Sequence, residues 1–470
     1  MILLKVVVLQ AFWLFCVKHA GGTFWPYYLS GALLLCFANF FIINRSRQRE
    51  VISFSRYLFM LLFFLFWGLC QDYLLFKSRI IDEIVAPYWL ISLWVVFLCY
   101  YGDIFQKFVR LKTPMLSIIG AIGGALAYYS GAKLSGLSLH QSMHIEFIIF
   151  VAISWAIFFP LSLREFEHGI IWNYLLDKSV VFSFDRTGFL RHQRNFKEGF
   201  KENSHEFNLQ GKRGLVTGGT SGIGRAVALK LSELGANITI TGRNLERAQE
   251  VINSNQLIDF LQLDMGQWSM FNHIDFSEKL DYLVLNAGAM PSQYTLNESG
   301  VELQAASQLI GHLKLMELLR HRELIDRHTR IIWVSSGGMY LKKLDLKNLL
   351  STDHYDKVAT YANVKRAQVT LVEELVGLSQ WKDWSIYSMH PGWVKTSGLD
   401  GALPGFVSLM NKRLRSPEQG ADTIIWLCLT KSSLVPGGFY FDRKRVSPYI
   451  SKKYIPSKNE REELVKASSC

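Results

Sequence analysis

The chain has 470 residues, of which 50% are hydrophobic and 14% aromatic, and its mean hydropathy of +0.15 excludes an average soluble protein. Its net charge of +12 comes without a basic stripe interleaved with aromatic residues, which speaks against nucleic-acid binding and favours attraction to anionic lipid. Charged side chains are unevenly spread, because residues 1–163 hold 12 basic and 6 acidic ones whereas residues 164–470 hold 39 and 33, although each part carries a net charge of +6.

Six apolar runs fill the first 163 residues, and each approaches the ~20 residues that span a bilayer core. They lie near residues 2–19, 24–44, 53–76, 84–101, 113–133 and 143–163. We therefore predict an α-helical transmembrane bundle of about six spans. The first run, which holds Lys5 and Gln10, is the weakest, and a cleavable signal peptide is its competing interpretation.

The basic residues of the short loops set the expected orientation. Loops after the second and fourth runs hold seven of them, against four on the other side: Arg45, Arg47, Arg49, Arg56, Lys107, Arg110 and Lys112 against Lys18, Lys77, Arg79 and Lys133. This bias places the N-terminus inside the cell, so six spans leave everything after Arg164 in the cytoplasm. With five spans, the residues after Arg164 would instead lie on the opposite side of the membrane.

The runs contain few groups that suggest more than an anchor. Gly120 and Gly124 form a small-xxx-small face for close helix packing. Lys5, Asp72 and Glu146 lie near the ends of their runs, where their side chains can reach the interface, so no ion or proton pathway is indicated and a transporter is disfavoured. We favour an anchoring bundle over a lipid-binding or substrate-delivering domain, which stays the alternative.

Residues 164–212 mix aromatic with basic side chains. The aromatic ones include Trp172, Tyr174, Phe182, Phe184, Phe189 and Phe196. This composition favours a juxtamembrane segment that lies on the membrane surface over a solvated linker.

From residue 213, short β-like runs alternate with helical stretches, in the order RGLVT, NITIT, DFLQL, DYLVLN, RIIWVS, WSIYSMH and GFYF. Such alternation predicts an α/β domain of the Rossmann type, with a parallel, doubly wound sheet. One helix start is marked by Ser416 as N-cap, Pro417 at the first position and Gln419 closing a capping box. The expected parts are a transmembrane domain at 1–163, the interfacial segment at 164–212, the α/β domain at 213–456 and a tail at 457–470.

The stretch TGGTSGIG follows the first expected strand and opens a helix. Its glycines permit a tight turn and close approach of the backbone to a pyrophosphate at the helix N-terminus. The expected cofactor loop consists of Thr217, Gly218, Ser221, Gly222, Ile223 and Gly224. A plain strand-to-helix turn is the competing interpretation, and the features that follow count against it.

Residues that follow the second, third and fourth expected strands suit the adenosine part of a dinucleotide. Arg243 stands where an NAD site usually carries an acidic residue and would pair with the 2′-phosphate of NADP(H), although it can also be a solvated charge. Asp264 would accept a hydrogen bond from the adenine amine. The floor under the adenosine would be formed by Asn286, Ala287 and Gly288.

Tyr361 and Lys365 lie four residues apart, which puts a phenol and an ammonium on one helix face. A phenol needs nearby positive charge to act as an acid or base at neutral pH, and Lys365 can supply it. Ser335 and Ser336 end the fifth expected strand, at the sheet edge where α/β proteins bind ligands. A tyrosine and a lysine at this spacing occur often by chance, so the prediction of a catalytic site rests on this pair together with the serines and the cofactor loop.

Together these residues resemble the signature of the short-chain dehydrogenase/reductase superfamily over about residues 212–445. The resemblance implies that Tyr361 donates a proton, that Lys365 binds the ribose and lowers the tyrosine pKa, and that Ser336 orients a carbonyl. It also implies a loop beside the nicotinamide that contains Pro391, Gly392, Val394 and Thr396.

Within the superfamily, segments such as YANVKRAQVTL, SMHPGW and FDRKRVSPYI are similar to the family-member-12 branch, a relative of retinol-dehydrogenase-like enzymes that act on lipophilic alcohols and carbonyls. One position departs from the family pattern. The family usually has an asparagine that kinks the helix after NAG so that a main-chain carbonyl holds a relay water, and Gln308 stands there instead. We keep Gln308 in the catalytic set and expect slower turnover, or NADP(H) binding without catalysis.

The first half, with LQAFWLFCV near its start, distantly resembles small bacterial inner-membrane proteins of unknown function. We expect a membrane-anchored, NADP(H)-dependent oxidoreductase of the bacterial inner membrane that reduces a lipophilic carbonyl, and an NADP-binding sensor or scaffold is the alternative. The expected partners are the lipid bilayer and a lipophilic small molecule, and homo-oligomerisation is left open. The six cysteines show neither metal spacing nor a disulfide framework, so no metal is expected.

Overall fold

The computed structural model describes residues 2–18, 25–46, 52–78, 88–101, 104–135, 144–196, 208–276 and 278–468. The chain divides into two units, Met1–Leu176 and Asp177–Cys470. Some residues used in the sequence predictions lie outside the described ones, namely Arg47, Arg49, Arg79, residues 197–207 and Cys470.

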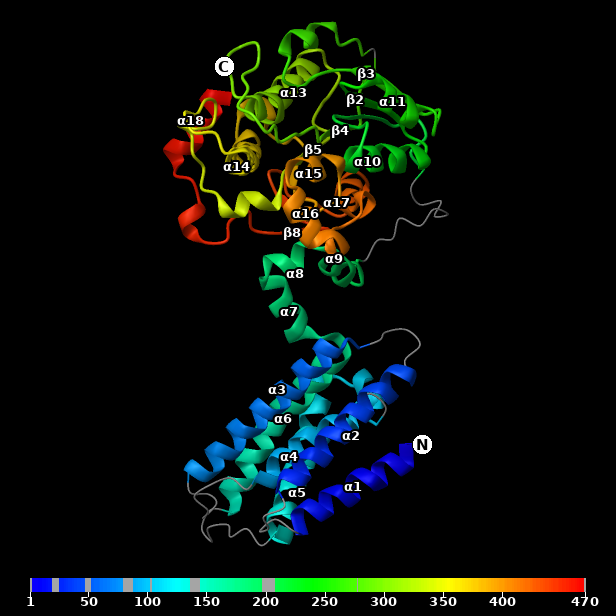
Figure 1. Ribbon diagram of the computed structural model, residues 1–470, viewed down its shortest axis with the longest axis vertical. Helices are drawn as coiled ribbons and strands as arrows, with labels where there is room; N and C mark the ends of the chain where they lie inside the picture. The colour runs from blue at the N-terminus through cyan, green and yellow to red at the C-terminus, as the bar shows by residue number, and fades with distance from the viewer. Residues whose placement is uncertain are drawn as a thin grey trace. The chain divides into compact units, whose positions relative to one another are not determined.

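Each of the six apolar runs contains a helix (Figure 1): α1 (Ile2–Lys18), α2 (Trp25–Ser46), α3 (Phe54–Lys77), α4 (Tyr88–Phe97), α5 (Thr113–Ser135) and α6 (His144–His168). Three of these are long and apolar enough to cross a membrane, over Phe54–Leu75, Thr113–Leu134 and His144–His168. The other three contain shorter apolar helices, at Lys5–Cys16, Leu29–Asn44 and Ile91–Tyr100. The helical region is therefore confirmed with three candidate spans, and the count of six stays a prediction.

The core of the first unit is aromatic. Phe64, Trp94, Phe97, Trp155 and Phe158 form ring pairs with centroids 4.8–6.3 Å apart. Such edge-to-face and offset contacts add to the gain from burying large rings.

The predicted small-residue face on α5 is confirmed by its close approach to α6. A Cβ on Gly120 would lie 2.3 Å from the carbonyl oxygen of Trp155, and one on Gly124 would lie 2.1 Å from Cγ of the same tryptophan. Asp72 departs from its prediction. Its side chain is 2% exposed and accepts hydrogen bonds from the Tyr128 hydroxyl at 2.9 Å and the Trp94 Nε1 at 3.3 Å, so it lies inside the unit and does not reach an interface.

The second unit contains one eight-stranded sheet, in the order β3-β2-β1-β4-β5-β6-β7-β8. The strands are β1 (Arg213–Val216), β2 (Asn237–Gly242), β3 (Ile258–Gln262), β4 (Tyr282–Leu285), β5 (Arg330–Val334), β6 (Ile386–Met389), β7 (Phe439–Phe441) and β8 (Lys444–Arg445). All pairs are parallel except β7 with β8. The seven predicted runs all form strands, and the two-residue edge strand β8 is too short to leave a pattern in the sequence.

Successive side chains along the buried strands point to opposite faces of the sheet, and helices cover both faces (Figure 1). Leu283 and Leu285 of β4 pack with α13 (Gly311–His321) and α14 (Lys357–Leu375). Val284 points to the opposite face, where α10 (Gly222–Glu233) and α17 (Pro417–Leu429) lie. The predicted capping box begins α17, because Ser416 Oγ accepts from the Gln419 backbone N–H at 3.3 Å and Gln419 Oε1 accepts from the Ser416 N–H at 3.1 Å. The doubly wound parallel sheet is confirmed.

Residues 177–193, which we call the docked segment, pack against the α/β domain through α8 (Val180–Phe184) and α9 (Arg186–Gln193). Phe184 and Phe189 are 7% and 3% exposed. The fully buried Arg415 donates to the carbonyl oxygens of Ser183 at 3.0 Å and Phe184 at 2.8 Å. This part of the predicted interfacial segment therefore belongs to the second unit.

Candidate active site

The glycine loop follows β1 and leads into α10. Gly218 and Gly222 have φ angles of +67° and +55°, in the left-handed region that favours glycine. A Cβ on Gly218 would lie 2.9 Å from the Cα of Ala287, and one on Gly224 would lie 2.3 Å from the carbonyl oxygen of Gly218. The chain can follow this path only with glycine at these positions.

The N-terminus of α10 has the features of an anion site. Ser221 is the N-cap residue in extended conformation, and its side chain makes no capping hydrogen bond to the described backbone. The first N–H groups of a helix need partners, and the helix dipole favours a negative one. The loop therefore fits the diphosphate of a dinucleotide, with Ile223 in the first turn of the helix.

Thr217 joins the loop to the predicted floor of the site. Its Oγ1 accepts hydrogen bonds from the backbone N–H groups of Asn286 at 2.9 Å and Ala287 at 3.0 Å. The Asn286 amide donates to the carbonyl oxygens of Thr217 at 3.0 Å and Gly218 at 3.3 Å. Gly288 follows, beside Gln308 and Lys365, so the predicted cofactor and catalytic residues meet there.

Arg243 follows β2 at the rim of this site. Its guanidinium Nη1 lies 3.8 Å from Asp264 Oδ2, and its side chain is 69% exposed. Asp264 also accepts from the Gly266 backbone N–H at 2.9 Å, which fixes the carboxylate. The guanidinium is thus positioned by one weak ion pair and remains accessible to a phosphate.

Tyr361 and Lys365 lie on α14, which Asp356 caps by accepting from two backbone N–H groups at 2.9 Å and 2.7 Å. Lys365 Nζ lies 5.3 Å from the centroid of the Tyr361 ring and donates to the Val334 carbonyl oxygen at 3.0 Å. Ser335 Oγ donates to the carbonyl oxygen of Lys365 at 2.9 Å, which ties α14 to the end of β5. The two predicted catalytic side chains therefore share one face at the carboxyl edge of the sheet.

Burial controls the protonation of this pair. It raises the pKa of Tyr361 to about 12, against the opposing effect of a hydrogen bond with Ser336. Burial also lowers the pKa of Lys365 to about 7. Burial thus raises the pKa of Tyr361, and the lowering of this pKa by Lys365 in the cofactor-bound site, which the resemblance implies, stays a prediction. A protonated phenol beside Ser336 is a proton donor at neutral pH.

Gln308 lies in a π turn, Ala306–Ile310, so the helix is irregular at this position even though it carries glutamine. Its Nε2 donates to the Ala289 carbonyl oxygen at 2.7 Å. The main-chain carbonyl oxygen of Gln308 accepts a hydrogen bond from Gln368 Nε2 at 2.5 Å and forms another with His312 Nδ1 at 2.9 Å. The helix is thus distorted at Gln308 as the resemblance implies for an asparagine, and the main-chain carbonyl of Gln308 has two hydrogen-bond partners.

Sequence reasoning did not single out His312, which links two parts of the site. Its Nε2 lies 3.1 Å from Thr217 Oγ1, and its other nitrogen bonds with Gln308. Burial lowers the pKa of His312 to about 3, so the ring is neutral. The signal in the sequence is the position of His312 near the end of GVELQAASQLIGHL, four residues after Gln308 and therefore on the same helix face.

The loop after β6 carries four predicted cofactor residues, Pro391, Gly392, Val394 and Thr396. Gly392 has a φ of +77°, and a Cβ there would lie 2.4 Å from Arg415 Nε. Thr396 Oγ1 accepts from the Leu399 N–H at 3.2 Å and so caps α15 (Ser397–Ala402). Its methyl group lies 3.0 Å from the position of a Cβ on Gly222, which brings this loop to the glycine loop.

Comparisons with known proteins agree with this geometry. Residues 212–402 match the short chain dehydrogenase family, and residues 2–161 match a protein family of unknown function, DUF2878. Dehydrogenase/reductase SDR family member 12 of Homo sapiens is 36% identical over 258 residues, which are 52% of this chain and 81% of that protein. Retinol dehydrogenase 11 of Mus musculus is 25% identical over 246 residues, which are 50% of this chain and 78% of that protein.

Among solved structures, a short chain dehydrogenase from Burkholderia cenocepacia J2315 in complex with NADP is similar to this chain at 23% identity. It covers 49% of this chain and 96% of its own, with a TM-score of 0.40. The predicted resemblances of both parts of the chain are confirmed by the family matches and by family member 12.

Proposed function

Because the chain belongs to the short-chain dehydrogenase/reductase family through its second unit, we propose that it is a membrane-anchored, NADP(H)-dependent oxidoreductase that interconverts a lipophilic alcohol and its carbonyl compound. The observation that carries this proposal is the placement of Tyr361, Lys365 and Ser336 at one edge of the sheet, beside the glycine loop.

The reaction would run as follows in the direction of reduction. When NADPH is bound in the glycine loop, its nicotinamide would supply the hydride that reduces the carbonyl carbon. The Ser336 hydroxyl donates a hydrogen bond to the carbonyl oxygen, and Tyr361 transfers its phenolic proton to that oxygen, which gives the alcohol. The Tyr361 phenol carries its proton at neutral pH, as this step requires.

Arg243 supports NADP(H) as the cofactor. It occupies the end of β2, where an NAD site would place a carboxylate for the ribose 2′-hydroxyl. Its mostly exposed guanidinium can instead form charge-assisted hydrogen bonds with a 2′-phosphate.

The retinol dehydrogenases among the relatives support a lipophilic substrate, and three apolar side chains on elements that adjoin predicted site residues in the sequence are exposed. Leu341 follows the Ser336 loop, Val358 lies in the first turn of α14, and Leu409 lies on α16 (Pro404–Met410), with exposures of 73%, 42% and 82%. Lys357 Nζ donates to the Ala402 carbonyl oxygen at 2.6 Å, which holds α15 beside the start of α14. The candidate spans would keep the enzyme in the membrane into which such a substrate partitions. A cytoplasmic site follows from the loop charges together with the six spans predicted from the sequence.

The proposal is tested by NADPH and NADH oxidation in membranes that contain the full-length protein, with a panel of membrane-soluble aldehydes and ketones. We expect oxidation with at least one carbonyl and a preference for NADPH. A panel without activity, despite measurable NADPH binding, would instead support an NADP-binding sensor, and the engaged carbonyl of Gln308 is the observation that favours this second candidate.

A further inference from the structure

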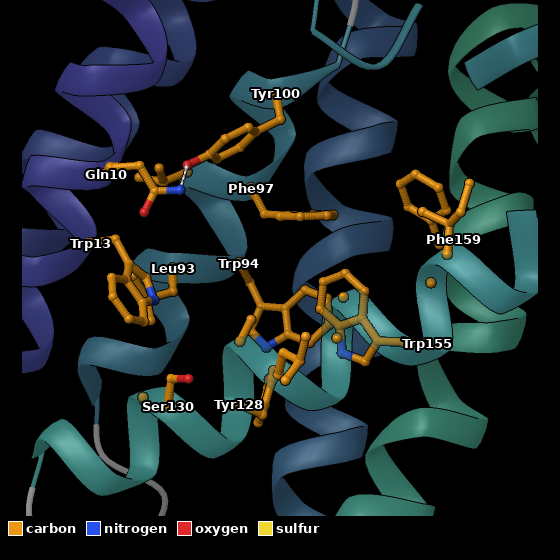
Figure 2. Close-up of a pocket in the computed structure, with 18 of the residues that line it drawn as sticks. Gln10, Trp13, Leu93, Trp94, Phe97, Tyr100, Tyr128, Ser130, Trp155 and Phe159 are labelled. Carbon is orange, nitrogen blue, oxygen red and sulfur yellow. Dashed lines mark hydrogen bonds between the residues drawn. The ribbon is translucent and has the colours of Figure 1, made fainter. Parts of the chain in front are cut away.

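The described part of the first unit contains a cavity of about 600 Å³. Figure 2 shows that its lining is mostly aromatic and aliphatic, with Trp13, Phe97 and Phe159 among the side chains. Gln10 and Tyr100 also line it, and they form a hydrogen bond with each other at 3.2 Å. Specificity in such sites comes from polar groups that are placed for the ligand, and these two are placed for each other. The docked segment of the second unit has a more specific arrangement, because it contacts two loops of the predicted active site.

Phe184 is the last residue of α8, and its ring packs on the loop that begins at Ser336. A Cβ on Gly337 would lie 2.6 Å from Cε2 of this ring, so the ring touches the backbone directly after Ser336. Ser336 Oγ accepts from the Gly338 N–H at 3.3 Å and so caps the short turn that follows. The Tyr340 ring of that turn lies 5.9 Å from the Phe184 ring between centroids. The Phe184 ring therefore limits where the Ser336 hydroxyl can lie.

The main chain of Phe184 holds the second loop, which follows β6. Its carbonyl oxygen accepts hydrogen bonds from the Trp393 backbone N–H at 2.9 Å and from Arg415 Nε at 2.8 Å. A Cβ on Gly392 would lie 2.6 Å from the same oxygen. The Phe184 ring also lies 4.5 Å from the His390 ring between centroids. This residue thus connects the Ser336 loop with the loop that carries four of the predicted cofactor residues.

Phe184 has the burial of a core residue. It is 7% exposed and belongs to a buried cluster that includes Met339 of the Ser336 loop and Val369 of α14, the helix of the predicted catalytic pair. The two family matches cover residues 2–161 and 212–402, so neither of them includes Phe184. The contact is therefore a feature of this chain that the family matches do not describe.

We infer that Phe184 is a positioning residue of the active site, and that the docked segment completes this site. The ring holds the Ser336 loop, and the main-chain carbonyl holds the loop after β6. Loss of the ring would leave a gap into which the Ser336 loop relaxes, and a misplacement of about 1 Å can lower a rate about 10²-fold. The inference rests on the proposed function, because it assigns Phe184 a role in that same site.

Phe189 of the docked segment provides a matched control. It is 3% exposed, and its ring lies 6.0 Å from the Phe196 ring and 5.3 Å from the guanidinium carbon of Arg415. It is not a member of the described cluster that contains Phe184. Leucine at either position keeps an apolar side chain and removes an aromatic ring, so the two variants differ mainly in which contact is lost.

The first measurement is backbone hydrogen exchange of the full-length protein in nanodiscs of dioleoylphosphatidylcholine. Phe184→Leu should lower the protection of the amides in residues 337–341 at least about tenfold, because the loop loses the ring against which it packs. Protection in β4, at the centre of the sheet, should stay within about twofold, whereas a general loss of stability would lower it as well. Phe189→Leu should leave residues 337–341 within about threefold of the parent.

The second measurement is NADPH-dependent reduction in the same nanodiscs, with farnesal as the probe aldehyde. Phe184→Leu should lower kcat about 10- to 100-fold, as expected for a displaced Ser336 hydroxyl. The NADPH dissociation constant should stay within about threefold, because the main-chain carbonyl of residue 184 still holds the loop after β6. Phe189→Leu should retain kcat within about twofold. Partial unfolding would instead lower kcat and the number of NADPH sites together.

Gly337→Ala tests the same contact from the loop. Gly337 is not among the glycines with positive φ, so its backbone admits alanine, but the added methyl group would meet the Phe184 ring. We expect a loss of protection in residues 337–341 of at least about tenfold. Adding Phe184→Leu, which removes the Cε2 atom, should restore that protection at least about threefold, since directly contacting residues are not additive.

The other outcomes overturn the inference. Parental protection and parental kcat in Phe184→Leu would show that the ring positions nothing, and equal effects of Phe189→Leu would reduce the docked segment to a general support. Additive losses in the double variant would exclude the direct contact, and Gly337→Ala decides the question should Phe184→Leu fail to fold. A parent that reduces neither farnesal nor any carbonyl of the panel would refute the proposed function, and amide exchange alone would then decide the inference.

Discussion

Arg415 is the side chain whose removal should disturb the second unit most. It is fully buried, and its guanidinium donates to both carboxylate oxygens of Asp442 at 2.6 Å and 2.9 Å. It also donates to the carbonyl oxygens of Ser183 and Phe184 in the docked segment, and to that of Pro391 at 3.3 Å in the loop after β6. We predict that Arg415→Met releases the docked segment and loosens that loop.

The magnitude follows from what the substitution leaves behind. Asp442 is 3% exposed, and among the described residues it would lose its guanidinium partner and keep its 2.6 Å contact with His192 Nδ1. Removing one partner of a buried ion pair costs about 3–5 kcal/mol, because the remaining charge stays buried. The double variant Arg415→Met with Asp442→Asn removes that charge and should recover about half of the loss or more.

Pulse proteolysis of the full-length protein in increasing urea measures the free energy of unfolding of the second unit. The single variant should lose about 3–5 kcal/mol relative to the parent. NADPH affinity should fall with it, since Pro391 and Gly392 contact Arg415. An unfolding free energy within about 1 kcal/mol of the parent, or a double variant as unstable as the single one, would refute the reasoning.

Three further predictions concern the cofactor and the docked segment. Arg243→Ala should weaken NADPH binding about 10- to 100-fold, which is the effect of losing a charge-assisted hydrogen bond of about 1.5–3 kcal/mol. NADH binding should stay unchanged in the same fluorescence titrations. Equal losses for both cofactors would contradict the assignment of Arg243 to the 2′-phosphate. Gly218→Ala should weaken binding of both cofactors at least about tenfold, since alanine at a φ of +67° costs about 1–2 kcal/mol and its Cβ would also meet Ala287. Parental affinity for both would contradict the approach of a cofactor to this loop. Burial alone lowers the pKa of His192, but hydrogen bonds with Asp177 and Asp442 outweigh it and raise that pKa. The stability from its protonation is therefore complete below about pH 6.5 and is lost as the pH rises through the raised value. The protection factors of α9 amides, which are corrected for the pH dependence of intrinsic exchange, should fall over that range in the parent and not in His192→Gln, and identical pH profiles would count against the contact.

The sequence predicted those features that depend on residues close together in the chain. The strands of the sheet are short apolar runs between helical stretches, and the glycines of TGGTSGIG stand where the backbone requires positive φ or close approach. Tyr361 and Lys365 could be paired from their spacing alone, because both lie on one helix.

The remaining features depend on contacts between residues far apart in the sequence. His192 meets Asp442 across 250 positions, and nothing near either residue indicates the other. Asp72 was expected at an interface because its run ends nearby, yet Trp94 and Tyr128 from two other helices enclose it. Burial also raises the pKa of Tyr361, and burial is not readable from a spacing motif.

The measurement that tests the central claim most directly compares the parent with Tyr361→Phe in carbonyl-dependent NADPH oxidation, together with NADPH affinity. The account predicts that loss of the phenolic proton lowers turnover about 10²- to 10⁴-fold while the NADPH dissociation constant stays within about twofold. Turnover at the parental rate in Tyr361→Phe would contradict it.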